Sequence, residues 1–269
     1  GNGGNPYDFH DALPAMGRLR APYTEVWVAS QNVPLIRFAD RVRSIPSTGL
    51  NLLEIPDRDP PAGLVEDLRS FDSIVSWYGA NRDQFRAVVE GLGLPVRLLP
   101  ALPAGAGVHV VDFYLGQIGA ETGAAPRIEC PRGDGGFAVI HPFSSRPAKN
   151  WPLERFRELA QLLGRRMPVE WCAGPGELLD QARRFDDLYE LACWLAQARV
   201  YIGNDSGIAH LAAATGAPVV VLFGPTDPAV WAPRGRNVRV ICRPGSVDRV
   251  SLDEVAHAVE GALASVELW

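Results

Sequence analysis

The chain has 269 residues, of which 47% are hydrophobic and 21% charged, and its formal net charge is −5. This composition fits one large or two small globular domains, and the negative charge argues against nucleic acid as the main partner. No apolar run reaches the ~18 residues of a membrane span, no signal peptide is recognisable, and the four scattered cysteines form no CxxC pair, which together favour a reduced, cytoplasmic protein.

The first part of the chain alternates strand-like and helix-like segments. The strand candidates are 24–30, 51–55 and 73–77, and the helix candidates are 9–20, 33–40, 62–69 and 81–91. Strands separated by helical stretches of about ten residues are typical of βαβ units, so we expect a parallel sheet here.

A change of composition follows in the middle of the chain. Segments 99–107 and 124–136 are rich in Pro and Gly, and they flank a helix-like stretch at 108–121. Such segments commonly link domains. We therefore predict an N-terminal Rossmann-like domain over 1–123 and a C-terminal one over 124–269.

The second half restarts the alternation more clearly. We predict strands at 137–142, 168–173, 200–203, 218–224 and 238–242, and helices at 152–164, 188–198, 206–216 and 252–263. Pro152 suits the first turn of its helix, and Gly216 suits the end of another.

Polar and glycine-rich residues collect where the strand at 200–203 ends, in the run "GNDSGIAH". In an open parallel sheet, ligands bind outside the carboxyl ends of the strands, where the start of a helix presents unpaired N–H groups and partial positive charge. Asp205, Ser206, Gly207 and His210 are therefore candidate binding residues. The alternative makes Asp205 or Ser206 a helix N-cap and His210 a core residue.

A second candidate site lies in "HPFSSRPAKNWP" at 141–152, which also follows a strand and precedes a helix. Of the 26 basic residues in the chain, 25 are arginine, and the one lysine, Lys149, is in this loop. A lysine acts as a compact point charge on phosphates, and Ser144 and Ser145 supply hydroxyls. A solvated proline-rich loop is the alternative. Glu177, in "WCAGPGE" after the next strand, is able to accept hydrogen bonds from a ribose, and a plain tight turn is the alternative.

These motifs resemble glycosyltransferase family 9, the ADP-heptose:lipopolysaccharide heptosyltransferases. The resemblance rests on "YIGNDSGIAHLAAATGAPVVVLFGPTDPAVWAP" at 201–233 and "HPFSSRPAKNWPLERFRELA" at 141–160, and it covers nearly all of 137–242. The family's N-terminal segment has an aspartate followed by proline six residues later, a spacing that Asp8 and Pro14 keep. Tyr7 replaces the family's glycine, and only seven residues precede Asp8, so we expect a short N-terminal domain in which the family's first strand is either absent or replaced at its edge by another segment.

The resemblance implies an α/β protein of the GT-B fold, with two Rossmann-like domains facing a cleft. It also implies an inverting glycosyltransferase that needs no metal or other cofactor. The donor is a nucleoside-diphosphate sugar such as ADP-heptose, and the acceptor is a glycolipid of the lipopolysaccharide type. Such an acceptor implies peripheral contact with the inner face of the membrane, for which Arg37, Arg41 and Arg43 offer a local basic patch.

The resemblance also implies roles for individual residues. Asp8 matches the catalytic base, and Lys149 stabilises charge on the leaving diphosphate, so both count as catalytic. The alternative for Asp8, at the start of a predicted helix, is an N-cap role. The donor-binding residues it implies are Ser144, Ser145, Lys149, Glu177, Asp205, Ser206, Gly207 and His210.

Two other functions remain as rivals. A serine hydrolase with Ser206 as nucleophile is disfavoured, because Asn204 and Ile208 occupy the glycine positions of a G-x-S-x-G elbow. A nucleotide-sugar-binding protein of the same fold that lacks transfer activity stays open. The "DRD" at 57–59 has the spacing of some metal-dependent transferases, but the prolines beside it favour a solvated loop.

Overall fold

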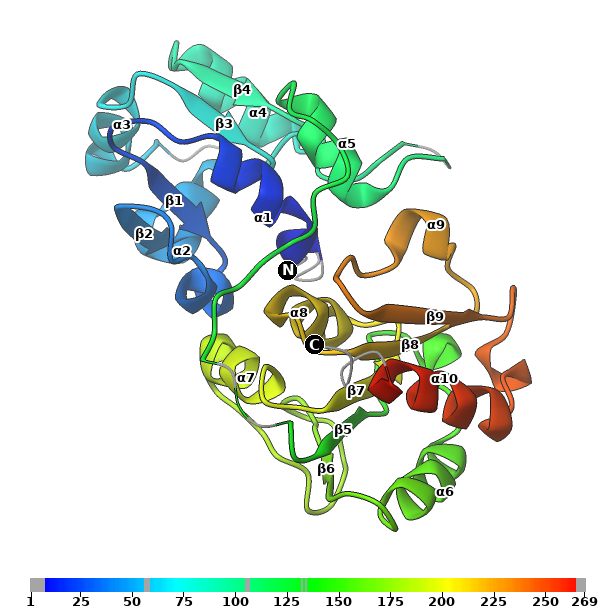
Figure 1. Ribbon diagram of the computed structural model, residues 1–269. Coiled ribbons are helices and arrows are strands. Elements are labelled where there is room, and N and C mark those ends of the chain that lie inside the picture. The colour runs from blue at the N-terminus through cyan, green and yellow to red at the C-terminus, as the bar shows by residue number, and fades with distance from the viewer. Residues whose placement is uncertain (1–7, 56–58, 105–106, 132, 134, 265–269) are drawn as a thin grey trace.

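The computed structural model describes residues 8–55, 59–104, 107–131, 133 and 135–264 (Figure 1). Its elements fall into two halves that are joined by a long irregular segment between α5 and β5. Helix α1 lies between the halves, because it packs against α5 on one side and α8 on the other. The predicted domain boundary falls within the irregular segment.

The C-terminal half is built on one parallel sheet with the strand order β6-β5-β7-β8-β9. Its strands are β5 (Ala138–His141), β6 (Val169–Trp171), β7 (Val200–Asn204), β8 (Val219–Phe223) and β9 (Val238–Cys242), and its helices are α6 (Leu153–Leu163), α7 (Leu188–Leu195), α8 (Gly207–Thr215), α9 (Pro228–Trp231) and α10 (Leu252–Ala264). Every residue of β5, β7 and β8 is buried. Parallel strands covered on both faces read as continuous apolar runs, which is why these strands were predictable from sequence.

Two hydrophobic cores lie on the two faces of this sheet. Helices α6 and α10 cover one face with side chains such as Phe156 and Val259. Helices α7 and α8 cover the other face, and the core there continues into the N-terminal half through Leu13 of α1 and Leu35. The two halves therefore share one continuous apolar core.

The N-terminal half places its described strands in two separate parallel pairs. The strands are β1 (Glu25–Val28), β2 (Arg41–Ser44), β3 (Ile74–Ser76) and β4 (Val96–Leu98), and the helices are α1 (Asp8–Arg18), α2 (Ile45–Thr48), α3 (Ala62–Arg69), α4 (Asp83–Gly91) and α5 (Val110–Gln117). β1 pairs with β2, and β3 pairs with β4. Within the described residues, no strand joins these pairs into one sheet. The segment in which the family has its first strand, residues 1–7, lies outside the described residues.

Two sequence predictions in this half are wrong. The helix predicted at 33–40 is a short 3-10 helix, Ser30–Leu35, because Pro34 lacks an N–H and the chain then enters β2. The strand predicted at 51–55 is also a 3-10 helix, Leu50–Glu54. Leu50 and Leu53 are both buried, and side chains three apart share one face of a 3-10 helix.

Candidate active site

The predicted donor-site residues lie at the point where the order of the C-terminal sheet reverses. β5 has β6 on one side and β7 on the other, so the loops after β5 and β7 leave in opposite directions. His141 pairs with Gly203 at the carboxyl ends of these strands. Open parallel sheets bind ligands at this kind of switch point.

Three loops converge on a buried ion pair at this edge. Lys149, in the loop after β5, places its Nζ 2.6 Å from Oδ2 of Asp205, which follows β7. Thr226, in the loop after β8, donates its hydroxyl to the same oxygen at 2.5 Å. The side chains of Lys149 and Asp205 are 15% and 8% exposed, so the pair is largely shielded from water. Because little water reaches the pair, Asp205 and not solvent holds the Lys149 ammonium group in position.

Asn204 anchors the loop that carries Lys149. Its Oδ1 accepts the N–H of Trp151 at 3.0 Å, and its Nδ2 donates to the carbonyl of Pro142 at 2.8 Å. Pro142 and Trp151 are the two ends of this loop, and Asn204 is fully buried. One side chain of β7 therefore fixes both ends of the lysine loop.

Ser206 and Gly207 form the start of α8. Ser206 is the N-cap residue and Gly207 the first residue of the helix, while Gly216 ends the helix in the left-handed conformation that favours glycine. Ser206 and Gly207 are both buried. Of the two N-cap candidates the structure selects Ser206, whereas Asp205 instead contacts Lys149 and Thr226.

His210 points toward the N-terminal half. Its Nδ1 lies 3.0 Å from Oδ1 of Asp11 on α1, and the two side chains are 7% and 2% exposed. His10, also on α1, is fully enclosed, and burial together with the nearby His210 lowers the pKa of His10 to about 4, although Asp11 raises it. His210 therefore joins the two halves through a buried contact with α1.

Glu177 lies beside His141, the last residue of β5. Its Oε2 is 3.1 Å from His141 Nε2 and accepts the N–H of Gly174 at 2.6 Å. Burial by itself raises the pKa of Glu177, but these hydrogen bonds outweigh burial and lower the pKa overall. The carboxylate stays ionised, is 27% exposed, and is suited to accept a hydroxyl hydrogen bond.

The other predicted residues are placed less tightly. The Ser144 hydroxyl lies 2.7 Å from Asn150 Oδ1 and 2.9 Å from the carbonyl of Arg146, so it braces its own loop. Ser145 is exposed. Asp8 is the first residue of α1, and its side chain lies outside what the structure describes.

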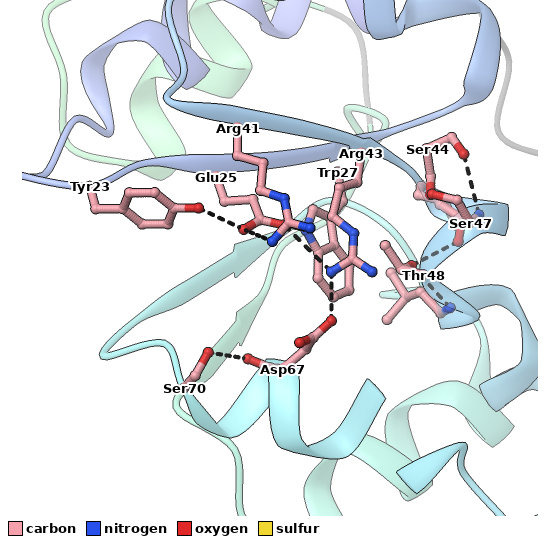
Figure 2. Close-up of polar contacts among 12 residues, drawn as sticks. Tyr23, Glu25, Trp27, Arg41, Arg43, Ser44, Ser47, Thr48, Asp67 and Ser70 are labelled. Atoms are coloured by element: carbon pink, nitrogen blue, oxygen red, sulfur yellow. Dashed lines mark hydrogen bonds and ion pairs between the residues drawn. The ribbon is translucent and has the colours of Figure 1, made fainter. Parts of the chain in front are cut away.

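The arginines predicted to form a basic patch already have partners (Figure 2). Arg41 and Arg43 lie 3.8 and 3.7 Å from the carboxylate of Glu25, which is only 4% exposed. Arg43 also contacts Asp67 at 2.5 Å. Arg37 stacks over the ring of Tyr189, with 4.5 Å between its Cζ and the ring centroid. Much of the positive charge is therefore neutralised within the protein.

In the described part of the chain, no three His, Cys, Asp or Glu side chains are grouped so as to hold a metal ion. None of the described helices has the length and apolar character needed to cross a membrane.

The family model described as glycosyltransferase family 9 (heptosyltransferase) matches residues 186–255. This segment of the chain is similar to glycosyltransferase family 9. The matched residues include β7, α8 and β8, and thus the start of the helix at Ser206. In the family-level comparison, Lys149 and Asp8 fall outside the matched segment.

Two curated family relatives give the extent of the sequence similarity. The chain is 34% identical to lipopolysaccharide heptosyltransferase 1 of Salmonella typhimurium over 121 residues, which are 40% of this chain and 38% of that protein. It is 31% identical to lipopolysaccharide heptosyltransferase 1 of Escherichia coli K12 over 141 residues, 47% of this chain and 43% of that protein. The similarity thus spans less than half of the length of these relatives.

Solved structures extend the likeness of fold to almost the whole chain. A family 9 glycosyl transferase from Veillonella parvula superposes with a TM-score of 0.75 at 17% identity, covering 97% of this chain and 95% of that one. The E. coli ADP-heptose LPS heptosyltransferase II gives a TM-score of 0.71 at 18% identity, covering 97% and 96%. The chain therefore has the GT-B fold.

Sequence reasoning missed three residues of this region. Thr226 lies in the "GPTDP" segment, and its position after β8 could have indicated the site. Asn204 and Asp11 have contacts 53–62 and 199 residues away in sequence, and no local pattern signals these contacts.

Proposed function

We propose that this protein is an inverting, metal-independent glycosyltransferase. It transfers a heptose-like sugar from a nucleoside-diphosphate donor to a glycolipid acceptor of the lipopolysaccharide type. The observation that carries the proposal is the convergence of Lys149, Asp205 and the start of α8 at the switch point of the parallel sheet. The names of the relatives, lipopolysaccharide heptosyltransferases, supply the sugar and the acceptor class.

The diphosphate would bind where positive charge and N–H donors meet. An ammonium group has three N–H donors, and the Lys149–Asp205 bond uses one of them. Asp205, held in turn by Thr226, keeps the ammonium in place. The N–H groups at the beginning of α8 add partial positive charge on the same edge.

The reaction is a direct displacement at the anomeric carbon. The acceptor oxygen forms a bond to this carbon while the bond to the diphosphate oxygen breaks, and the configuration inverts. Negative charge grows on the leaving diphosphate, where Lys149 stabilises it; one preorganised donor of this kind contributes about 2.7–4 kcal/mol. Asp8 takes the proton of the acceptor hydroxyl as the new bond forms. Asp8 begins α1, the helix that packs against α8.

The acceptor would approach from the N-terminal half. Because Arg41 and Arg43 are engaged with Glu25 and Asp67, recognition of an anionic glycolipid there would depend on the exposed part of Arg41, whose side chain is 58% exposed. Peripheral contact with a membrane surface follows from the proposed acceptor.

The first experiment tests the donor site. Lys149→Met should weaken ADP binding measured by calorimetry and lower kcat/KM for ADP-heptose at least 100-fold. The double variant Lys149→Met/Asp205→Asn removes the ion pair as a unit and should lose binding to the same degree while keeping its fold. Arg157→Met is a matched control, because Arg157 is 51% exposed on α6, and it should change neither quantity. Unaltered ADP binding by both lysine variants would refute the donor site.

A second experiment separates transfer from binding. Asp8→Asn should lower the transfer rate by about 10²–10⁴-fold and leave ADP affinity unchanged. An unchanged transfer rate would remove Asp8 as the base. Tight ADP binding by the unaltered protein, without turnover of any donor and acceptor pair tried, would instead indicate a nucleotide-sugar-binding protein.

A further inference from the structure

Two buried hydroxyl groups beside β7, those of Tyr201 and Ser206, have no hydrogen-bond partner among the described residues outside their own pair, in which at most one O–H can donate to the other. Tyr201 is 0% exposed and Ser206 is 5% exposed. Leaving a buried hydroxyl unpaired costs about 1–3 kcal/mol, so folded proteins seldom do it without a functional reason. Two such groups on neighbouring residues of one site call for an explanation.

Ser206 does not act as its position would suggest. It is the N-cap residue of α8 and has extended backbone geometry, with φ −151° and ψ 159°. A serine at this position usually accepts an N–H from the first turn of its helix, but the Ser206 side chain makes no such bond. Its hydroxyl is therefore not used to stabilise the helix.

The Tyr201 hydroxyl lies near Ser206 because residue 203, between them on the chain, is a glycine without a side chain. Residues two apart on a strand face the same side, and the Tyr201 ring lies along β7 over Gly203. A Cβ on Gly203 would lie 2.6 Å from the Tyr201 hydroxyl oxygen and 2.8 Å from the His141 carbonyl. Only glycine leaves room for the phenol at the carboxyl end of the strand.

The phenol is a hydrogen-bond donor at neutral pH. Burial raises the pKa of Tyr201 well above its usual value, and the hydrogen bond with the Ser206 hydroxyl offsets part of this effect. The carboxylates of Glu177 and Asp205 are already paired, with His141 and Lys149 respectively. The groups that remain at this point, two O–H donors and the N–H groups at the start of α8, all favour an anion.

We propose that Tyr201 belongs to the donor site, where its hydroxyl and that of Ser206 together hold one oxygen of the donor's diphosphate, directly or through one bound water. The inference rests on the proposed function, which it extends by adding a residue that no motif indicated. It also explains why "YIGNDSG" joins a tyrosine, a glycine and a serine at this spacing.

Tyr201→Phe tests the proposal with opposite effects on stability and binding. The variant keeps the ring and removes only the unpaired hydroxyl, so the urea midpoint without ligand should stay the same or rise. ADP affinity, measured by calorimetry with UDP and GDP in parallel, should fall about tenfold, as expected for the loss of one hydrogen bond to a charged group.

Tyr114→Phe is the matched control. Tyr114 is 2% exposed, but its hydroxyl donates to the Ala101 carbonyl at 2.6 Å in the N-terminal half. Its loss should lower the urea midpoint and leave ADP affinity unchanged, which is the reverse of the result expected for Tyr201→Phe.

Ser206→Ala and the double variant Tyr201→Phe/Ser206→Ala complete the test. If both hydroxyls hold one oxygen, the double variant should weaken ADP binding by less than the product of the two single effects. Destabilisation of Tyr201→Phe with unchanged ADP affinity would show that the hydroxyls only bond each other, and would overturn the proposal alone. Failure of the unaltered protein to bind any of the three nucleotides would overturn the proposed function and this inference with it.

Discussion

The two halves of the chain have the same alternation of strands and helices, but their strands are buried to different extents. In the C-terminal half, β5, β7 and β8 consist entirely of buried residues. In the N-terminal half, the residues of β2, β3 and β4 are half-buried or exposed, and the described strands form two separate pairs. The half with the continuous sheet is the one that holds the Lys149–Asp205 pair.

The difference indicates which half of the chain positions the charged groups of the proposed donor site. A sheet with a core on each face is a stiff base for charges that must be placed to within a fraction of an ångström. The N-terminal half has small sheets and depends on its contact with α8 through α1. Because the two halves share one core, we expect them to unfold together, and the four predictions below compare what residues of the two halves and of their junction contribute to stability.

The largest effect should come from truncating one isoleucine to alanine in each half. Ile202 of β7 is 0% exposed, whereas Ile74 of β3 is half-buried. Ile202→Ala should lower the free energy of unfolding by about 2–5 kcal/mol, as a fully enclosed cavity requires. Ile74→Ala should cost less than half of this, because water and neighbouring side chains fill the space. Equal losses in urea unfolding would contradict the contrast between the halves.

The next effect concerns His10, which α1 buries at the junction. Since the pKa of His10 is about 4 in the folded state and near 6.5 when unfolded, the unfolded chain binds its proton first as the pH falls. The protein should therefore lose about 3 kcal/mol of stability between pH 6.5 and pH 4 through this residue. His10→Leu should have a flatter stability curve over that interval. Parallel curves for the two proteins would show that His10 is not enclosed in solution.

A smaller effect should come from the ion pair that joins α5 to the C-terminal half. Both Asp112 oxygens contact Arg234, at 2.6 and 2.5 Å. Hydrogen bonds from Arg234 are the main cause that lowers the pKa of Asp112 to about 2 from 3.8. This stabilisation, about 2 kcal/mol, is present above pH 4 and is lost as the pH falls toward 2. The stability difference between the unaltered protein and Asp112→Asn should shrink over that range, and a constant difference would contradict the assignment.

The smallest effect, the loss of an exposed ion pair, should be the same in both halves. Arg86 pairs with Glu90 on α4, and Arg157 pairs with Glu154 on α6, and all four side chains are at least half exposed. Arg86→Ala and Arg157→Ala should each change the free energy of unfolding by about 0.5 kcal/mol or less, because water screens exposed pairs. A markedly larger loss for either would mean that its pair is shielded in solution.

The same contrast explains what the sequence could predict. The apolar runs at 200–203 and 218–224 indicated strands because both of their faces are buried, and β7 and β8 confirm this. β2 and β4 were missed, since strands of four and three residues containing exposed arginines resemble loops. The expectation that the lysine loop and the start of α8 meet follows from parallel topology, and the structure brings them together.

Other parts of the site could not be predicted because they depend on tertiary packing. The sequence left open whether Asp205 caps a helix or binds a sugar, and its contact with Lys149 lies 56 residues away. The Asp11–His210 contact requires the two halves to be placed relative to each other. The unpaired state of the Tyr201 hydroxyl depends on the path of the whole strand.

The carboxamide of Asn204, which holds the carbonyl of Pro142 and the N–H of Trp151, has a consequence for the lysine between them. A segment fastened at both ends to a single side chain loses most of its independent motion, so little freedom remains to be given up when an anion arrives. Lys149 is then positioned for a bound anion as precisely as a residue of a β-strand, although it lies in a loop.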